Sequence, residues 1–186
     1  MVKAFGDRLV QVLDGHILAK ADEALAGRGG GMGACGRRAL GPFGESALPR
    51  AHLFLVYPMT DATSSMESHR TNGKGYLLEQ DDINWFHEQY LVNEAQARDP
   101  RVSPYYAPDV SGVAPAIVLV AGFDPLRDEG IAYAERLRKA GVRVDLRCED
   151  SLIHGWWSIT GVVEAAHRSV TRVAGAIRRE LLHSSA

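Results

Sequence analysis

The sequence has few cysteines, no long apolar run and no excess of charge of either sign. Its 186 residues include 2 cysteines, Cys35 and Cys148, which give neither a disulfide framework nor a metal-ligand spacing and fit a reducing compartment. No apolar stretch is long enough to span a bilayer, and the amino terminus lacks the apolar core of a signal peptide. The formal net charge of −2 favours neither nucleic acid nor an anionic membrane as partner. We therefore expect one cytoplasmic domain of ordinary globular composition.

The best-patterned stretch of the chain runs from Ala116 to Trp156. Its first part, Ile117 to Val120, has the apolar density of a strand buried on both faces, and it stops before Pro125. From Asp128 to Gly141 the apolar residues follow helical spacing. Val142 to Cys148 then alternates apolar and polar residues, as a second strand does. The pattern predicts one βαβ unit.

Two chemically active side chains follow the strands of this unit, Asp124 after the first and His154 after the second. Functional groups in open α/β sheets gather at the carboxyl ends of strands, so we expect the two at one edge. There a carboxylate can orient an imidazole and stabilise its protonated form. Other interpretations stay open: Asp124 can simply cap the next helix, His154 can be an ordinary loop histidine, and Asp128 or Asp150 can be its orienting acid.

Several segments carry a resemblance to a known family. They are DPRVSPYYAPD (99–109), AGFDPLRDEG (121–130), RLRKAGVRV (136–144) and IHGW (153–156), with LFLVYPMTD (53–61) and NWFHEQYL (84–91) upstream. Over roughly residues 53 to 180 the chain resembles the carboxyl-terminal half of the hormone-sensitive-lipase-like branch of α/β-hydrolase esterases and lipases. The resemblance implies a Ser-His-Asp mechanism on small carboxylic esters of short or medium acyl chain, without cofactor or metal. It also implies that Asp124 is the triad acid and His154 the triad base.

The nucleophile region of that family has no clear counterpart in this sequence. The family's serine stands in a G-x-S-x-G elbow, and its usual distance of about 28 residues from Tyr57 points to Gly29, where no serine stands. Ser46 imitates the motif, but too few residues separate it from the next strand for a crossover helix, so we interpret it as a loop residue. The family's His-Gly-Gly-Gly oxyanion motif is also absent. We therefore expect weak activity or none from this chain alone.

Residues 1–50 differ in character from the rest. Apolar residues at helical spacing from Leu9 to Leu25 predict a helix that covers one face of the sheet. Residues 26–50 are rich in glycine and arginine without a period. We interpret residues 1–50 as an atypical helix plus a segment that replaces the nucleophile region. Within it, Gly31–Gly36 matches the G-x-G-x-x-G string of dinucleotide sites, but no strand precedes it and no acid follows at the ribose position.

Residues 51–186 are interpreted as the carboxyl-terminal part of an α/β-hydrolase domain. The expected elements are a strand at Leu53–Tyr57, a polar loop at Asp61–Gly75, a helix at Leu77–Leu91 and a final helix over residues 158–182. In the resembled family, the loop and helix after this strand help to wall the acyl or alcohol pocket. The candidates for substrate contact are Trp85, Phe86, Tyr90 and Trp156. For the first three, plain core packing is the favoured alternative.

The predicted architecture is a partial α/β-hydrolase fold, with three parallel strands near Leu53, Ala116 and Val142 and helices on both faces of the sheet. The predicted function is that of a carboxylic-ester hydrolase that keeps its acid and base but lacks the serine elbow. Two alternatives of other classes remain. One is a non-enzymatic remnant that binds a hydrophobic ligand, a partner chain or a second copy through a sheet edge left unpaired by missing strands. The other is a nucleotide-binding domain that uses the glycine run.

Overall fold

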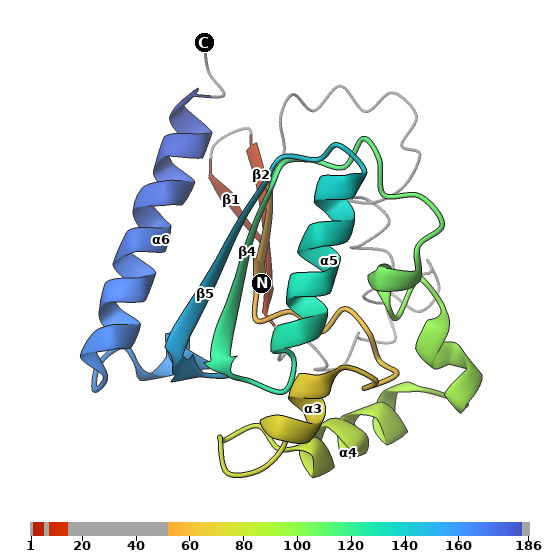
Figure 1. Cartoon of the computed structure of the whole chain (residues 1–186). Helices are drawn as coiled ribbons and strands as arrows, with labels where there is room; N and C mark the ends of the chain where they lie inside the picture. Colours follow the sequence, from red (N-terminus) through yellow and green to blue (C-terminus); the bar gives the residue numbers. More distant parts are fainter. Residues whose placement is uncertain (1, 6–7, 15–51, 184–186) are drawn as a thin grey trace.

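The computed structural model describes residues 2–5, 8–14 and 52–183, with side chains for residues 52–180. Its centre is a five-stranded sheet in the order β1-β2-β3-β4-β5 (Figure 1). The strands are β1 (Val2–Phe5), β2 (Arg8–Asp14), β3 (His52–Val56), β4 (Ala116–Phe123) and β5 (Val144–Ile153). β1 is antiparallel to β2, and the pairs from β2 to β5 are parallel. The carboxyl ends of β2 to β5 therefore share one edge.

The sheet contains two strands that the sequence pattern did not predict. The helix expected from Leu9 to Leu25 is wrong over its first part, because β2 pairs in parallel with β3, beginning with Val10 beside His52. A short apolar run satisfies helical spacing and strand spacing alike, and the valines of this run favour a strand. The rest of the expected helix and the glycine-rich segment lie outside the described residues.

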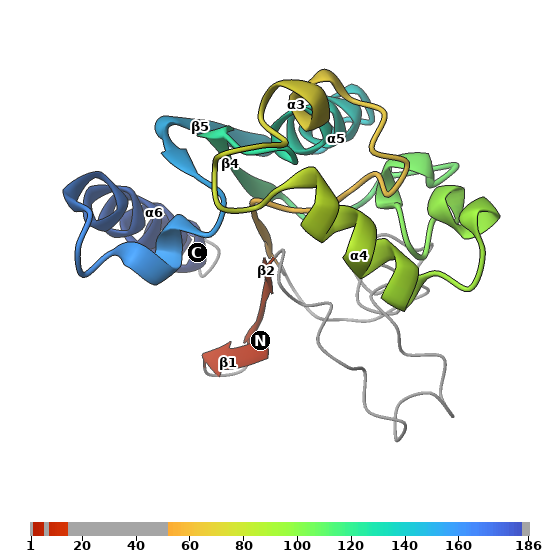
Figure 2. The same cartoon turned by 90° about the horizontal axis from the view of Figure 1, so that it is seen from below.

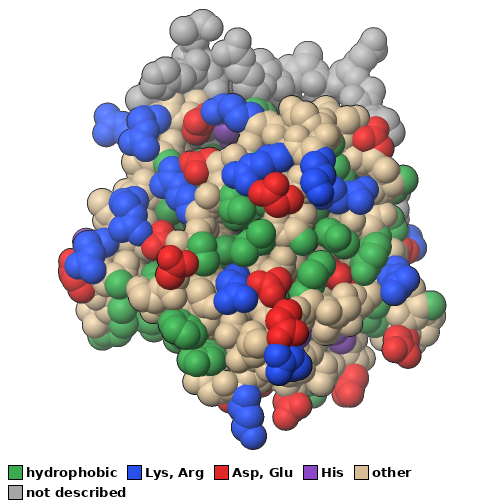
Figure 3. Space-filling view, in the orientation of Figure 1, with side chains coloured by type: hydrophobic (Ala, Val, Ile, Leu, Met, Phe, Trp, Pro, Cys, Tyr) green, Lys and Arg blue, Asp and Glu red, His purple; other side chains and the backbone are tan. Residues whose placement is uncertain are grey.

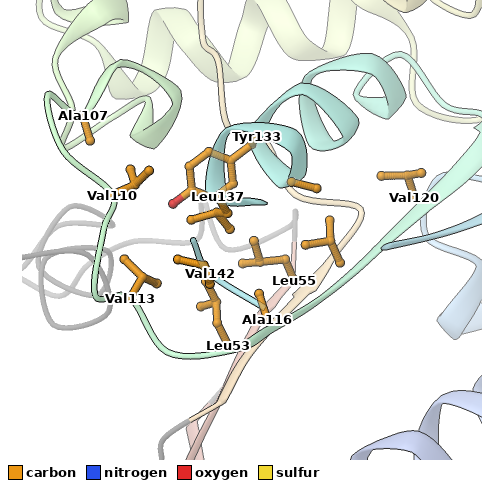
Figure 4. Packing of buried hydrophobic residues seen from close by; sticks show 12 residues of the cluster. Leu53, Leu55, Ala107, Val110, Val113, Ala116, Val120, Tyr133, Leu137 and Val142 are labelled. Atoms are coloured by element: carbon orange, nitrogen blue, oxygen red, sulfur yellow. The ribbon is translucent and has the colours of Figure 1, made fainter. Parts of the chain in front are cut away.

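The two faces of β3 and β4 carry different hydrophobic clusters because side chains alternate along a strand. On one face the strands pack against α6 (Glu164–His183), and on the other against α5 (Arg127–Lys139). The first cluster includes Phe54, Val56, Ile117, Leu119, Trp156 and Val173; the second includes Leu53, Leu55, Val118, Val120, Tyr133 and Leu137. Figure 2 shows the two helices on opposite sides of the sheet, and Figure 4 shows Tyr133 and Leu137 reaching down onto the strands.

The predicted fold class is confirmed, and the described part of the chain has five strands where the sequence predicted three. β4 runs from Ala116 to Phe123 and is buried over its first six residues, as the apolar pattern indicates. Each large side chain fully buried between a strand and a helix contributes about 1.5–3 kcal/mol. The βαβ unit of β4, α5 and β5 is thus held by both faces of its first strand, which makes it a rigid support for groups at the strand ends.

The helices match the sequence pattern where they are long. α4 (Gln80–Tyr90) lies within the predicted range and begins with a capping box between Glu79 and Asp82. α5 ends before Gly141, whose φ of 83° suits glycine. The segment predicted as a polar loop contains α3 (Glu67–Thr71), which is too short to show a period. Among the residues that the structure describes there are also three 3₁₀ turns: η1 (Glu94–Arg98), η2 (Pro104–Tyr106) and η3 (Trp156–Ile159).

The surface carries charges of both signs close together. On the face shown in Figure 3, lysine and arginine side chains lie among acidic ones, with small hydrophobic patches between them. Exposed ion pairs such as Arg138 with Glu135 and Arg168 with Glu164 account for part of this pattern. Among the described residues, no helix is both long and apolar enough to cross a membrane.

Candidate active site

The ends of β4 and β5 bring a carboxylate and an imidazole together. Phe123 and Ile153 are register partners at these ends, and Asp124 and His154 follow them directly. His154 Nδ1 lies 2.9 Å from Asp124 Oδ2, and the two residues are 1% and 0% exposed. An ionised carboxylate can only accept, so Nδ1 donates, and in the neutral ring Nε2 is the acceptor nitrogen. The pair therefore has the form of a base held in one tautomer by a buried acid.

Of the acids that the sequence left open as partners of His154, Asp124 is the one that contacts the imidazole. Asp128 accepts the backbone N–H of Ser68 and pairs with Arg127, while Asp150 is exposed on β5. Asp124 faces His154 with one oxygen, and its other oxygen accepts the backbone N–H of Leu126 at 2.8 Å. Asp124 thus holds the turn before α5 with one oxygen and orients the imidazole with the other, which fixes the direction of the carboxylate.

An aromatic side chain packs against the imidazole of His154. The ring of Tyr57 lies 4.6 Å from that of His154 and 4.9 Å, edge-on, from that of Trp156. Trp156 is 0% exposed and donates its Nε1–H to Ser169 Oγ on α6 at 3.2 Å. Trp156 is therefore a core residue here, and a hydroxyl on α6 satisfies its indole N–H. Contact of Trp156 with a substrate stays a prediction.

Comparison with known proteins supports what this geometry suggests. A family model described as alpha/beta hydrolase fold matches residues 25–158. The carboxylic ester hydrolase LipN of Mycobacterium tuberculosis is 45% identical over 129 residues, which are 69% of this chain and 34% of that protein. The chain belongs to the α/β-hydrolase family. The matched span begins upstream of Leu53, so the likeness reaches further toward the amino terminus than the sequence motifs indicated.

Other relatives of this α/β hydrolase are esterases as well. The ethyl acetate hydrolase of Pseudomonas putida is 38% identical over 137 residues, covering 74% of this chain and 43% of that protein. A solved esterase structure from Pyrobaculum calidifontis superposes with a TM-score of 0.69 at 31% identity and covers 79% of this chain and 47% of that one. These relatives confirm the esterase branch that the sequence resembles. The chain spans less than half the length of each of them.

The remaining candidates for substrate contact lie on α4 of the α/β hydrolase. Trp85 is 56% exposed and packs edge-on against Phe86, whose half-buried ring joins a small cluster with Leu126. Tyr90 is half-buried at the end of the helix. A cavity of about 780 Å³ lies between α4, η1 and the loop after β3, and its lining includes His87 but none of these three aromatic residues. Their contact with a substrate stays a prediction.

The structure contains a second buried carboxylate–imidazole pair that the sequence motifs did not indicate, and its carboxylate follows Asp124 closely in the chain. Glu129 is 0% exposed, accepts the backbone N–H groups of Thr60 and Asp61 on Oε1, and lies 2.8 Å from His69 Nε2. His69 Nδ1 lies 2.8 Å from Gln80 Oε1. In the sequence, Glu129 is an acidic residue in the first turn of a helix, where acids are common. Its position four residues before Tyr133, on the buried face of α5, was the available signal.

The charge state of this second pair follows from its contacts. Burial lowers the pKa of His69, but the hydrogen bond and charge of Glu129 and the contact with Gln80 outweigh it, so the pKa is raised. Burial also raises the pKa of Glu129, whereas two backbone donors favour its charged form. Because both partners of His69 are acceptors, both of its ring nitrogens donate. We therefore describe this pair as a buried ion pair.

The sequence positions that correspond to the family's nucleophile, Gly29 and Ser46, and the glycine string Gly31–Gly36 lie outside the described residues. Within the described part of the chain, no three His, Cys, Asp or Glu side chains are arranged to hold a metal ion.

Proposed function

We propose that this chain is a carboxylic-ester hydrolase whose acid–base machinery is Asp124 and His154. The observation that carries the proposal is the buried 2.9 Å contact between them at the carboxyl ends of adjacent parallel strands. It is supported by relatives named as hydrolases of carboxylic esters and of ethyl acetate. The substrates we infer are small esters with a short or medium acyl chain.

In this mechanism each residue of the pair has one task. His154 Nε2 takes a proton from the water that attacks the ester carbonyl and gives it to the alkoxide that leaves, so that acid and alcohol form, while Asp124 holds Nδ1 and stabilises the imidazolium. The chain contains neither a G-x-S-x-G elbow nor a His-Gly-Gly-Gly oxyanion motif. Without a nucleophile, acid and base leave only a small part of the catalysis of a complete triad. We therefore expect slow turnover.

The test is hydrolysis of p-nitrophenyl butyrate by the purified chain. We expect a rate above that of buffer that is lost in His154→Ala and in Asp124→Asn, with His167→Ala, an exposed histidine on α6, as the matched control. In a complete triad, replacing the acid by its amide lowers kcat about 10⁴-fold. A fluorophosphonate probe applied in parallel reports any activated serine. A rate that persists in His154→Ala, or no rate above buffer in the wild-type chain, contradicts the proposal.

One observation favours a second function, association with another copy. β5 is ten residues long and stands at the end of the sheet, paired with β4 on one side. The strand at Leu53 is not an edge, because β2 pairs with β3. The charges of Asp145, Arg147 and Glu149 alternate in sign along β5. In the antiparallel register that sets Asp145 opposite Arg147, a second β5 would be held by opposite charges and by backbone hydrogen bonds. Sedimentation over a range of concentrations tests this, and a monomer at every concentration rules it out.

A further inference from the structure

The backbone that carries Asp124 leaves the strand ladder just before this residue. The register between β4 and β5 shifts between Ala121 and Phe123. At this shift Gly122 lies so close to β5 that a Cβ on it would overlap the carbonyl oxygen of Asp150. Bulges of this kind re-aim the side chains that follow them and remove backbone groups from the ladder. The direction of the Asp124 side chain therefore depends on what holds the irregular backbone around it.

Asn72, the residue that ends α3, holds this backbone from the side. Its Nδ2 lies 3.2 Å from the carbonyl oxygen of Gly122 and 3.2 Å from that of Asp124. A side-chain amide has two N–H donors, one for each carbonyl. Arg127 Nη1 also donates to the Gly122 carbonyl, at 3.0 Å. Asn72 is 7% exposed, so water competes little for these bonds.

The rest of α3 anchors Asn72 to the same loop. Ser68, one helical turn earlier, donates its hydroxyl to the carbonyl oxygen of Pro125 at 2.6 Å and its backbone N–H to Asp128 at 2.9 Å. Residues four apart lie on one face of a helix, so Ser68 and Asn72 both hydrogen-bond the segment that carries Asp124. In both Figure 1 and Figure 2, α3 lies beside the amino-terminal end of α5.

We infer that Asn72 is a positioning residue for the Asp124–His154 pair: its amide fixes the carbonyl groups of Gly122 and Asp124 and so aims the carboxylate at His154 Nδ1. The inference rests on the proposed function only in that the pair works as acid and base. The geometry of the pair can be measured without turnover. The alternative is that Asn72 contributes to overall stability like any buried amide and has no particular effect on the pair.

The experiment follows the His154 Nδ1–H by NMR on the full chain with isotope-labelled histidine, with His154→Ala to assign the resonance. We expect this proton to exchange with water about five- to tenfold faster in Asn72→Ala than in wild type. This ratio of rates corresponds to the net free energy of one hydrogen bond. Ser103→Ala is the matched control. It also removes two buried hydrogen bonds, to Ala62 and Ala97, but does not touch this loop.

The control decides between positioning and plain stability. The inference is overturned if Asn72→Ala leaves the exchange rate unchanged, or if Ser103→Ala accelerates it equally at equal global stability. Should Asn72→Ala fail to fold, Asn72→Ser keeps one donor and is expected to lie between wild type and that variant; a wild-type rate in it counts against the inference. Where the chain turns over ester, we expect Asn72→Ala to lower kcat with KM retained. An inactive wild-type chain contradicts the proposed function, but the exchange rates of the His154 Nδ1–H still test the role of Asn72.

Discussion

The protein contains two buried carboxylate–imidazole pairs whose carboxylates lie on one short stretch of chain. Asp124 meets His154 at 2.9 Å, and Glu129 meets His69 at 2.8 Å. Chemically the pairs are alike, and all four residues are less than a tenth exposed. They differ in what else touches them. Gln80 accepts from the second nitrogen of His69, so this ring donates from both nitrogens and has no lone pair for a substrate proton.

The difference teaches that surroundings, and not residue types, separate a chemical pair from a structural one. Glu129 ties α5 to the loop after β3 by accepting two of that loop's backbone N–H groups. Asp124 instead stands at the carboxyl edge of the sheet, where α/β folds place their reactive groups. We therefore expect changes at Glu129 to act mainly on stability and changes at Asp124 mainly on function.

The largest effect is expected from Glu129→Ala. It leaves a buried imidazolium without its counter-ion and two backbone donors without an acceptor, which costs about 3–5 kcal/mol of the free energy of unfolding. Urea unfolding measures this. Glu135→Ala on the exposed side of the same helix is the control and is expected to change stability by less than about 0.5 kcal/mol. Equal effects of the two variants would contradict the structural role of the Glu129 pair.

A smaller loss of stability is expected from Gly122→Ala, which changes the backbone next to the Asp124–His154 pair. The added Cβ meets the backbone of Asp150 and forces β4 and β5 apart, at a cost of about 1–3 kcal/mol. Thermal unfolding measures the cost, and the His154 Nδ1–H resonance shows whether the pair is displaced with the backbone. For Gly161→Ala, where a Cβ meets nothing within 4 Å, we expect neither change.

The pH dependence of the free energy of unfolding tests whether His69 is charged in the folded protein. The pKa of His69 is raised in the folded protein above its usual 6.5 because Glu129 and Gln80 outweigh burial. A raised pKa means that the stabilisation is fully present below the unfolded pKa and is lost as pH rises through the folded pKa. The stability difference between wild type and His69→Gln should therefore shrink as pH rises above 6.5. A difference that grows with pH would mean that His69 is neutral in the fold.

The smallest effect is expected from Glu180→Gln at the far end of the molecule, where the ion pair is partly exposed. The hydrogen bond from Arg143 and the proximity of His52, against partial burial, lower the pKa of Glu180 to about 2. Its stabilisation is present above the usual 4.5 and is lost as pH falls toward 2. Solvent screening limits it to less than about 1 kcal/mol at neutral pH by urea unfolding. If Glu180→Gln lowered the free energy of unfolding as much as Glu129→Ala does, the expected difference between exposed and buried ion pairs would be wrong.

The sequence predicts the part of the fold whose signals are local. β4, α5 and β5 follow one another within 38 residues, from Ala116 to Ile153, and their periods, Pro125 and Gly141 mark their ends. Because parallel strands share an edge, the meeting of Asp124 and His154 follows from this unit alone. Their contact in the structure agrees with that expectation.

The rest depends on partners far away in the chain. β2 is a strand because β3 offers it a pairing edge, and its own period does not distinguish it from a helix. Glu129 and His69 are 60 residues apart, so no window of sequence shows that they meet. Trp156 packs in the core, where Ser169 on α6 accepts from its indole, and a motif match cannot show this.

The small sequence separation between Asp124 and His154 also has a consequence for the order of folding. The pair closes a loop of 30 residues, whereas the contact of His52 with Glu180 closes one of 128. Closing a longer loop costs more chain entropy and comes later in folding. We therefore expect β4 and β5 to gain protection first in pulsed hydrogen exchange and the α6 contacts to follow; the reverse order would contradict this. The Asp124–His154 pair would then be assembled before the molecule that surrounds it is complete.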